Sequence, residues 1–364
     1  MVPWGMISTL SVQNFTLFDQ AQLRFSGGLN VFVGQNGTGK SHLMKLLYAN
    51  LRALMSEMEG AAAPTKKHLE TAIARRLKGI FRPDALGRLT RRQQGRCRAD
   101  VCMSLEAGHE LRYSFSTQSS EAVSVEAFPA SWNDKLSVYL PTREMLSIYP
   151  NFTGTYESVE IPFEETWYDL ARMLGRPLSK GPKRRECSTL LDPLQAPEVL
   201  NGTVVLENGR FYLRSKDNGK LEAHLLSEGL RKIATVAHLI ANGSLTQGSV
   251  LFWDEPEANL NPLLVRRVAA TIQTLVERGT QVFIATHSLF LLRELYLLER
   301  ASRERVDAGA GYEPRYFTLQ PGSTPEQHVQ IACASDMNGL PDLASLDAQV
   351  DQDERLMEIY RHGI

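Results

Sequence analysis

The sequence predicts an α/β fold with a mainly parallel core sheet, an antiparallel β lobe and an inserted helical and irregular subdomain. Three observations predict it. Residues 34–41 (GQNGTGKS) stand between an apolar strand-like run and a helix-like run. After residue 227, strand-like and helix-like segments alternate, which is typical of a parallel sheet. Within residues 100–140, short runs alternate apolar and polar residues, as antiparallel strands do.

Composition narrows the class of protein. The chain has 364 residues, of which 43% are hydrophobic and 22% charged, which indicates a globular protein with a large core. No apolar run approaches the roughly 20 residues that span a bilayer, and the N-terminus lacks the blocks of a signal peptide. The 4 cysteines form no Cys-x-x-Cys pair, so we expect reduced thiols in a cytoplasmic protein.

The N-terminal elements follow from local patterns. Residues 6–33 predict two or three strands, and residues 41–58 predict a helix. In the basic segment that follows, residues 66–78 are helix-like, and Gly79, Pro83 and Gly87 then interrupt the pattern.

The middle of the chain is less regular. Residues 100–128 predict a small antiparallel sheet and residues 137–140 a short strand. The proline-rich stretch 151–200 predicts one helix, at 163–174. Asn208-Gly209 lies between two apolar runs and predicts a hairpin.

The C-terminal part predicts the order helix, strand, helix, strand, helix, strand, with these elements at residues 227–241, 249–253, 262–278, 280–285, 288–300 and near 315–319. The last residues predict a peripheral segment with a short helix at 353–360. The expected division is a core at 1–50 and 201–320 with the β lobe at 100–140, a basic insertion at 51–99, an inserted subdomain at 141–200 and a peripheral segment at 321–364.

The segment 34–41 fits the phosphate-binding pattern Gly-x-x-x-x-Gly-Lys-Ser. Backbone N–H groups of such a loop surround a phosphate at a helix N-terminus, and here they would come from Asn36, Gly37, Thr38 and Gly39. Lys40 would reach the β- and γ-phosphates, and Ser41 would hold Mg²⁺. The alternative is a glycine-rich turn that only caps a helix.

Two later strand ends carry candidate catalytic side chains. The apolar run 250–253 ends in Asp254 and Glu255. On a parallel sheet this end faces the phosphate loop, so Asp254 would bind in the Mg²⁺ shell and Glu255 would polarise the attacking water. The next strand ends at His287, whose imidazole would contact the γ-phosphate. The alternatives are a solvated acidic turn and a structural histidine.

Residues 226–232 (LSEGLRK) begin a helix for which Ser227 is a good N-cap. The simplest interpretation is a capped helix. The functional one adds that its N–H groups and hydroxyl are presented to an anion.

The order of these motifs resembles that of the ABC-type ATPases, and within them the RecF, SMC and OLD-like branch. Residues 254–262 (DEPEANLNP) and 286–288 (THS) carry the resemblance together with the phosphate loop and residues 227–229. It implies a homodimer in which each ATP lies between one subunit's Lys40 loop and the other's Ser227 and Gly229. Asn259 would lie on the loop that crosses the interface.

The chain also departs from that pattern. The ABC-type ATPases usually have the signature Leu-Ser-Gly-Gly, and here Glu228 replaces the first of these glycines. Its carboxylate would lie near a docking phosphate unless it points away. The nearest candidate for a Gln loop is residues 140–144 (LPTRE). The sequence shows no long heptad arm and no acidic cluster of a TOPRIM nuclease after His287.

The basic insertion opens three interpretations: contact with nucleic acid, docking on an acidic partner protein, or a solvated arm. The DNA interpretation would use seven arginines: Arg75, Arg76, Arg88, Arg91, Arg92, Arg96 and Arg98. The expected function is an ATP-hydrolysing switch that controls a process involving DNA or a partner nuclease, toxin or other effector, in anti-phage defence or DNA repair. The alternatives are an ATP-bound scaffold or sensor and a transporter ATPase subunit.

Overall fold

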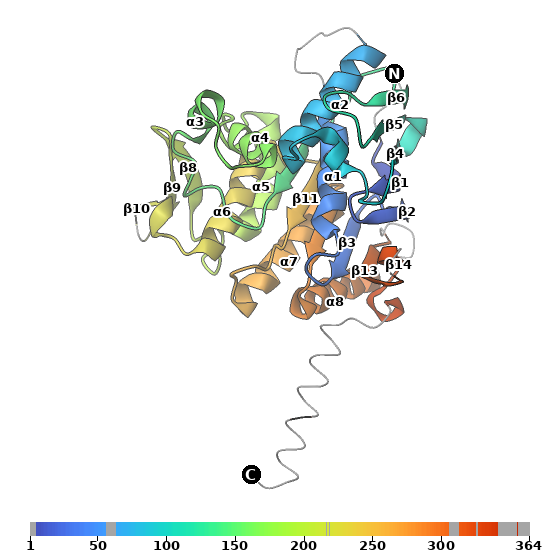
Figure 1. Ribbon diagram of the computed structural model, residues 1–364. Coiled ribbons are helices and arrows are strands. Elements are labelled where there is room, and N and C mark those ends of the chain that lie inside the picture. The colour runs from blue at the N-terminus through green and yellow to red at the C-terminus, as the bar shows by residue number, and fades with distance from the viewer. Residues whose placement is uncertain are drawn as a thin grey trace.

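A six-stranded sheet forms the centre of the molecule (Figure 1), and its order is β14-β13-β3-β12-β11-β7. The computed structural model describes residues 5–55, 63–215, 217, 219–305, 313–324, 327–340 and 355. Five strands run parallel and β14 alone is antiparallel to its neighbour. The strands are β14 (Gln327–Ala334), β13 (Arg315–Thr324), β3 (Leu29–Gly34), β12 (Gln281–Thr286), β11 (Val250–Asp254) and β7 (Ser137–Leu140). The predicted α/β fold with a mainly parallel core sheet is confirmed.

A second sheet is antiparallel and has the order β2-β1-β4-β5-β6. Its strands are β1 (Ile7–Phe15), β2 (Phe18–Arg24), β4 (Arg98–Leu105), β5 (Glu110–Ser116) and β6 (Ser124–Ala127). Because β1 pairs with both β2 and β4, the N-terminal strands belong to this lobe. β7, which the sequence placed in the lobe, instead pairs with β11 in the central sheet.

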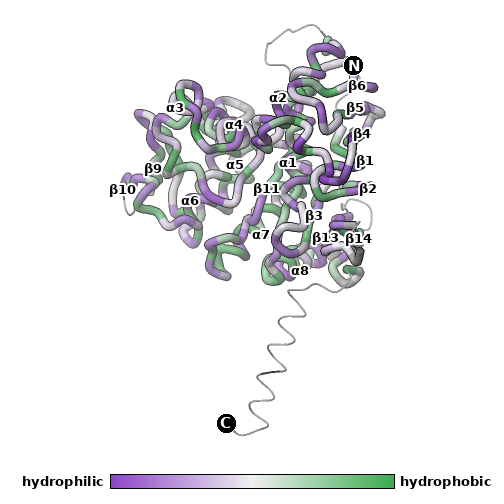
Figure 2. The backbone as a smooth tube through the Cα atoms, viewed as in Figure 1, coloured by the Kyte–Doolittle hydropathy of each residue, from purple (hydrophilic) through white to green (hydrophobic). Residues whose placement is uncertain are grey.

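The two faces of the central sheet belong to different cores. Along β3, Phe32 faces one core while Val31 and Val33 face the other, because successive side chains of a strand point to opposite sides. The first core also holds the antiparallel sheet with α1 (Lys40–Ala53) and α2 (Lys66–Phe81). Phe252 and Phe283 stack there with ring centroids 5.0 Å apart. Figure 2 shows hydrophobic and hydrophilic residues alternating along these elements.

The second core is covered by the helices of the C-terminal half and of the inserted subdomain. These are α4 (Glu165–Leu174), α5 (Pro182–Gln195), α6 (Glu228–Ala241), α7 (Pro262–Glu277) and α8 (Leu289–Arg305). α3 (Phe152–Ser158) packs beside α4. The prediction of one helix within 151–200 is therefore incomplete. Pro182 begins α5, where its missing N–H is not needed, and Pro193 lies in the last turn.

A three-stranded sheet with the order β10-β9-β8 follows the subdomain. It contains the predicted hairpin, β8 (Thr203–Glu207) and β9 (Arg210–Ser215), and β10 (Gly219–Glu222). Four short 3-10 helices lie at Leu86–Leu89, Glu106–Gly108, Ala223–Leu225 and Met337–Gly339 within the described residues.

The predicted C-terminal segment differs from the structure at its start, and its predicted helix is not described. The expected start of a peripheral segment at residue 321 falls inside β13, and β14 then extends the central sheet. The predicted helix at 353–360 lies outside the described residues, apart from residue 355. None of the helices in the described part of the chain combines the length and apolar character that crossing a bilayer requires.

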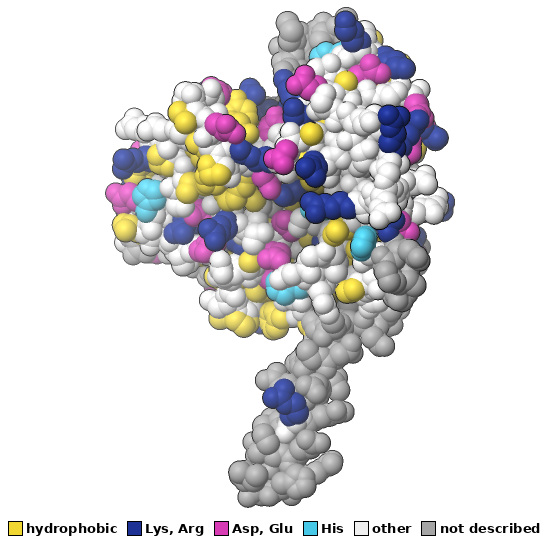
Figure 3. All heavy atoms as spheres, viewed as in Figure 1, with side chains coloured by type: hydrophobic (Ala, Val, Ile, Leu, Met, Phe, Trp, Pro, Cys, Tyr) yellow, Lys and Arg dark blue, Asp and Glu magenta, His cyan; other side chains and the backbone are white. Residues whose placement is uncertain are grey.

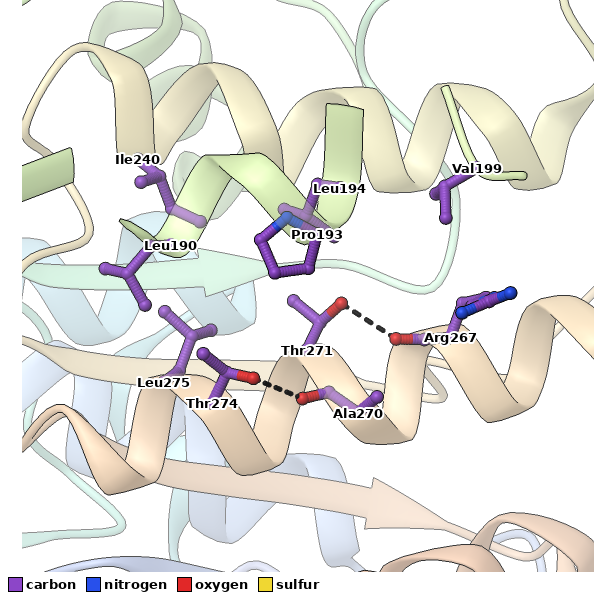
Figure 4. Close-up of a pocket in the computed structure, with 10 residues that line it drawn as sticks. All are labelled: Leu190, Pro193, Leu194, Val199, Ile240, Arg267, Ala270, Thr271, Thr274 and Leu275. Carbon is purple, nitrogen blue, oxygen red and sulfur yellow. Dashed lines mark hydrogen bonds between the residues drawn. The ribbon is translucent and has the colours of Figure 1, made fainter. Parts of the chain in front are cut away.

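A cavity of about 50 Å³ lies between α5, α6 and α7 (Figure 4). Its walls are mainly apolar and include Leu190, Leu194 and Ile240. The hydroxyls of Thr271 and Thr274 donate to carbonyl oxygens of their own helix, so their hydrogen bonds do not require a polar group inside the cavity. The cavity is far too small for a nucleotide, and no motif residue lines it.

Candidate nucleotide-binding site

The phosphate loop joins the end of β3 to the first residue of α1. Gly37 and Gly39 have φ of 82° and 90°, in the left-handed region that favours glycine. A Cβ on Gly39 would also lie 2.6 Å from the Phe18 ring, so a larger residue would displace the loop. Gln35, Asn36 and Gly37 are exposed. The loop therefore opens to solvent at a helix N-terminus, which suits an anion.

Lys40 lies beneath this loop with its side chain buried. Its Nζ donates to the carbonyl oxygens of Gly34 and Gln35 at 2.7 and 2.8 Å. Burial lowers the pKa of the Lys40 ammonium, and the nearby carboxylates of Glu255 and Asp254 oppose that shift. The cation thus lies where a phosphate held by the loop would need it.

Ser41 and Asp254 bring two oxygens together beside the loop. The Ser41 hydroxyl donates to Asp254 Oδ1 at 3.0 Å, and the Tyr139 hydroxyl donates to Oδ2 at 3.2 Å. Burial raises the pKa of Asp254, while the Ser41 hydrogen bond opposes the rise. A hydroxyl and a carboxylate are ligands that Mg²⁺ accepts, so this donor set fits the ion. Tyr139 was not predicted, because only the pairing of β7 with β11 brings it here.

Glu255 and His287 meet at the carboxyl ends of β11 and β12. These strands are parallel neighbours, with Asp254 opposite Ala285. Glu255 has φ of 46°, and its N–H donates to Ala285 O at 2.9 Å. His287 Nδ1 lies 3.3 Å from Glu255 Oε1, and their side chains are 52% and 25% exposed. The predicted carboxylate and imidazole are thus adjacent and open to a ligand.

Glu257 is a buried carboxylate that the sequence did not single out. The Thr286 hydroxyl donates to its Oε1 at 2.5 Å. Burial raises the pKa of Glu257, and the Thr286 hydrogen bond opposes the rise. Thr286 precedes His287, so this contact fixes the loop after β11 against the end of β12. An acid two residues after Glu255 was the available signal in the sequence.

The predicted residues Ser227, Gly229 and Asn259 form a separate group. Ser227 Oγ accepts from Leu230 N at 3.4 Å, as the capped-helix interpretation expects. Asn259 Nδ2 donates to Glu228 Oε1 at 3.0 Å, so the carboxylate is engaged by the loop after β11. Within the described residues, the side-chain hydrogen bonds of Ser227 and Asn259 join them to α6 rather than to the phosphate loop.

The Gln-loop candidate contacts α6 instead. Glu144 is buried and lies 2.7 Å from Arg231 Nε of α6 in an ion pair. Its backbone neighbours line a small hollow with Lys232 and Trp253. The segment 140–144 thus connects the end of β7 to α6, the helix that begins after Ser227.

The basic insertion does not present all its arginines to solvent. Arg76 is 5% exposed and its Nη1 lies 2.7 Å from Glu165 and 3.3 Å from Asp169. Its predicted DNA contact is therefore wrong: the side chain stabilises the packing of α2 on α4. Arg98 pairs with Asp100 and Glu126 but stays half exposed.

The other candidate arginines of the insertion lie nearer the surface. The exposed ones are Arg75, Arg88, Arg92 and Arg96, while Arg91 is half-buried. Figure 3 shows Lys and Arg side chains gathered near β4 and β5.

The architecture and the phosphate loop define a P-loop ATPase fold of the ABC and SMC-head type. A crystal structure of "the SmcHead bound to the C-winged helix domain of ScpA" has a TM-score of 0.53 at 14% identity, covering 92% of this chain and 98% of that one. The SMC head domain from Thermotoga maritima gives 0.47 at 13% identity, over 90% and 99% of the two chains.

Family comparison agrees with the fold. Residues 106–293 match the family described as "AAA domain, putative AbiEii toxin, Type IV TA system", and the chain belongs to this family. Residues 6–78 match the family described as "AAA ATPase domain". The two matches together include the phosphate loop, both strand-end acids and His287. No curated protein sequence matches the chain.

Proposed function

We propose that this protein is an ATP-binding and ATP-hydrolysing switch that dimerises around two ATP molecules and controls a partner effector. One observation carries the proposal. The phosphate loop, the Ser41–Asp254 pair and the Glu255–His287 pair all lie at the carboxyl edge of one parallel sheet. Such an edge is where open α/β sheets bind nucleotides.

Each group has a distinct role in hydrolysis. The loop N–H groups and Lys40 bind and orient the phosphates. Mg²⁺, held by Ser41 and Asp254, would neutralise charge on the β- and γ-phosphate oxygens. Glu255 accepts a hydrogen bond from the attacking water and takes its proton. His287 Nδ1 lies 3.3 Å from Glu255 Oε1. An imidazolium donates from both ring nitrogens, so in that form Nδ1–H would donate to Glu255 while Nε2–H donates to the γ-phosphate.

Dimerisation is supported by exposed apolar side chains next to the motifs. Leu225 and Leu263 are 71% exposed, and Phe290 is 41% exposed. They lie two residues before Ser227, two after Asn261 and three after His287. Figure 3 shows hydrophobic side chains on the surface beneath α7. Exposed apolar groups around a polar site favour a protein partner there, and a second copy closing over ATP would cover them.

The kind of partner is inferred from the relatives. The family description names a toxin of a type IV toxin–antitoxin system. The SMC head of the similar structure is bound to a domain of ScpA. These support a role beside a nuclease, toxin or other effector protein in bacterial defence or DNA repair. DNA is the second candidate ligand, favoured by the exposed Arg88, Arg92 and Arg96.

The test compares wild type with Glu255→Gln and with Glu160→Gln, a control whose side chain is 92% exposed. Molecular mass is measured with and without Mg²⁺-ATP, and ATP turnover with and without double-stranded DNA. We expect Glu255→Gln to bind ATP, to lose turnover and to accumulate as a dimer, because the water is no longer activated. DNA-stimulated wild-type turnover would support DNA as the ligand.

Other results point elsewhere. Mass that does not depend on ATP in either protein would contradict the nucleotide-driven switch and favour a stable scaffold or sensor. Turnover by Glu255→Gln equal to that of Glu160→Gln would show that another group activates the water. A transporter subunit would instead require a membrane-embedded partner for its activity.

A further inference from the structure

We infer that Glu228 is a positioning residue that fastens the loop 258–261 to the start of α6, so that both act as one unit. This inference rests on the proposed function, in which that unit meets the ATP of a second copy. Two side chains of α6 hold neighbouring residues of the loop. Glu228 Oε1 accepts from Asn259 Nδ2 at 3.0 Å, and Lys232 Nζ donates to Ala258 O at 2.7 Å.

The loop is held from both sides. Asn259 has φ of 62°, in the left-handed region, which Asn adopts more readily than most residues with a side chain. Its backbone is held on the other side because Leu260 N donates to Glu257 O at 3.1 Å. The side-chain amide of Asn259 is therefore positioned between this turn and the Glu228 carboxylate.

Gly229 brings the helix and the loop close together. A Cβ there would lie 2.6 Å from Leu260 Cδ2 and 2.9 Å from Leu264 Cδ1. This packing favours glycine without any phosphate, since a Cβ would require the Leu260 and Leu264 side chains to move. The same close approach lets the short Glu228–Asn259 contact form.

Lys232 is a buried cation on which the Glu228 carboxylate acts electrostatically. The Lys232 side chain is 4% exposed and lies one turn further along α6. Burial lowers the pKa of Lys232, and Glu228 is the largest influence opposing this. The Glu228 carboxylate itself is directed toward Asn259, whose Nδ2 donates to it. It nevertheless keeps a negative charge at the helix end that would face the partner's ATP.

Glu228 therefore has two opposed effects. Its oxygen orders the loop, which favours catalysis, and its charge repels phosphate, which weakens the closed dimer. Glu228→Gln keeps a carbonyl acceptor for Asn259 but removes the charge. Glu228→Ala removes both. Glu222→Gln, at an exposed strand end, is the matched surface control.

The experiment has two readouts. First, hydrogen exchange of the 258–261 amides is measured in nucleotide-free protein. We expect exchange about tenfold faster in Glu228→Ala, as the loss of a hydrogen bond to a charged group implies, and unchanged in Glu228→Gln. Second, kcat, KM and the ATP-dependent dimer Kd are measured. We expect a lower kcat with unchanged monomer ATP affinity in Glu228→Ala, and a wild-type kcat with a tighter dimer in Glu228→Gln.

Equal exchange in Glu228→Ala and wild type would overturn the inference, as would a Glu228→Gln protein that behaves like Glu228→Ala. Failure of the proposed function would look different. Wild type would then form no ATP-dependent dimer, while hydrogen exchange in the monomer would still report whether Glu228 orders the loop.

Discussion

Asp169 of α4 gives the sharpest stability prediction. Its side chain is 1% exposed and accepts from Tyr48 at 2.8 Å and from two nitrogens of Arg52 at 3.1 and 3.2 Å. Arg76 Nη1 lies 3.3 Å away. Asp169→Asn keeps the shape but removes the carboxylate with which Arg52 forms its ion pair in the described part of the chain. The largely buried Arg52 guanidinium would then lose its ion-pair partner.

The magnitude follows from this geometry. Breaking a buried ion pair from one side destabilises a protein by about 3–5 kcal/mol. We expect the lower figure, about 3 kcal/mol, because Glu165 still faces Arg76 at 2.7 Å. At about 2.1 cal/mol/K per residue, unfolding all 364 residues together carries about 0.8 kcal/mol/K. The expected fall in Tm is therefore about 4 °C.

The assay is thermal and urea unfolding of wild type, Asp169→Asn and the surface control Glu160→Gln. Glu160 pairs with Arg82 at 3.5 Å but is 92% exposed, so its loss should change stability by less than about 1 kcal/mol. If the unpaired cation causes the loss, adding Arg52→Met to Asp169→Asn should restore part of the stability. An Asp169→Asn protein as stable as the control, or a double variant with no recovery, would refute the reasoning.

Two further predictions concern the nucleotide site. Lys40→Ala should weaken ATP binding by about 30–100-fold in calorimetry, because a charge-assisted contact is lost. The control Lys66→Ala, at a side chain that is 58% exposed, should bind ATP as wild type does. Equal affinities of the two variants would place the phosphates elsewhere. The affinity for Mg²⁺-ATP should fall at both low and high pH. Burial raises the pKa of Asp254, so affinity should decline as pH falls through a value above the pKa of an ordinary aspartate. Burial lowers the pKa of Lys40, so affinity should also decline as pH rises through a value below the pKa of an ordinary lysine. Asp254→Asn should abolish the acid limb alone, and an unchanged acid limb in that variant would assign it to another group.

The sequence could predict what local patterns determine. A glycine loop between an apolar strand and a helix, and the alternation after residue 227, depend on neighbours in the chain, and the structure has these elements within a few residues. Pairing between distant strands has no such signal. Nothing near residues 137–140 indicates that β7 lies beside β11, so the approach of Tyr139 to Asp254 could not be predicted.

The prediction for Arg76 was wrong because its partner is also distant in the chain. A run of basic residues predicts a solvated face or an anion-binding surface, because burial of arginine requires a partner that the run itself lacks. The partner of Arg76 is Asp169, 93 residues away on another helix. Glu228 shows the opposite case. The sequence left open whether this carboxylate lies near a docking phosphate or points away from it. In the structure it accepts a hydrogen bond from Asn259, 31 residues later.

Helix α1 gives these separate observations a common physical basis. Its first turn carries Lys40 and Ser41, and its later turns carry Tyr48 and Arg52, which contact Asp169. At 1.5 Å per residue the helix spans about 16 Å between Ser41 and Arg52. A displacement of its first turn by a bound nucleotide would therefore be carried to α4 and, through Arg76, to the basic insertion. Because Arg52 forms its ion pair with the buried Asp169, a shift of the C-terminal end of α1 would weaken that pair unless α4 moves with it.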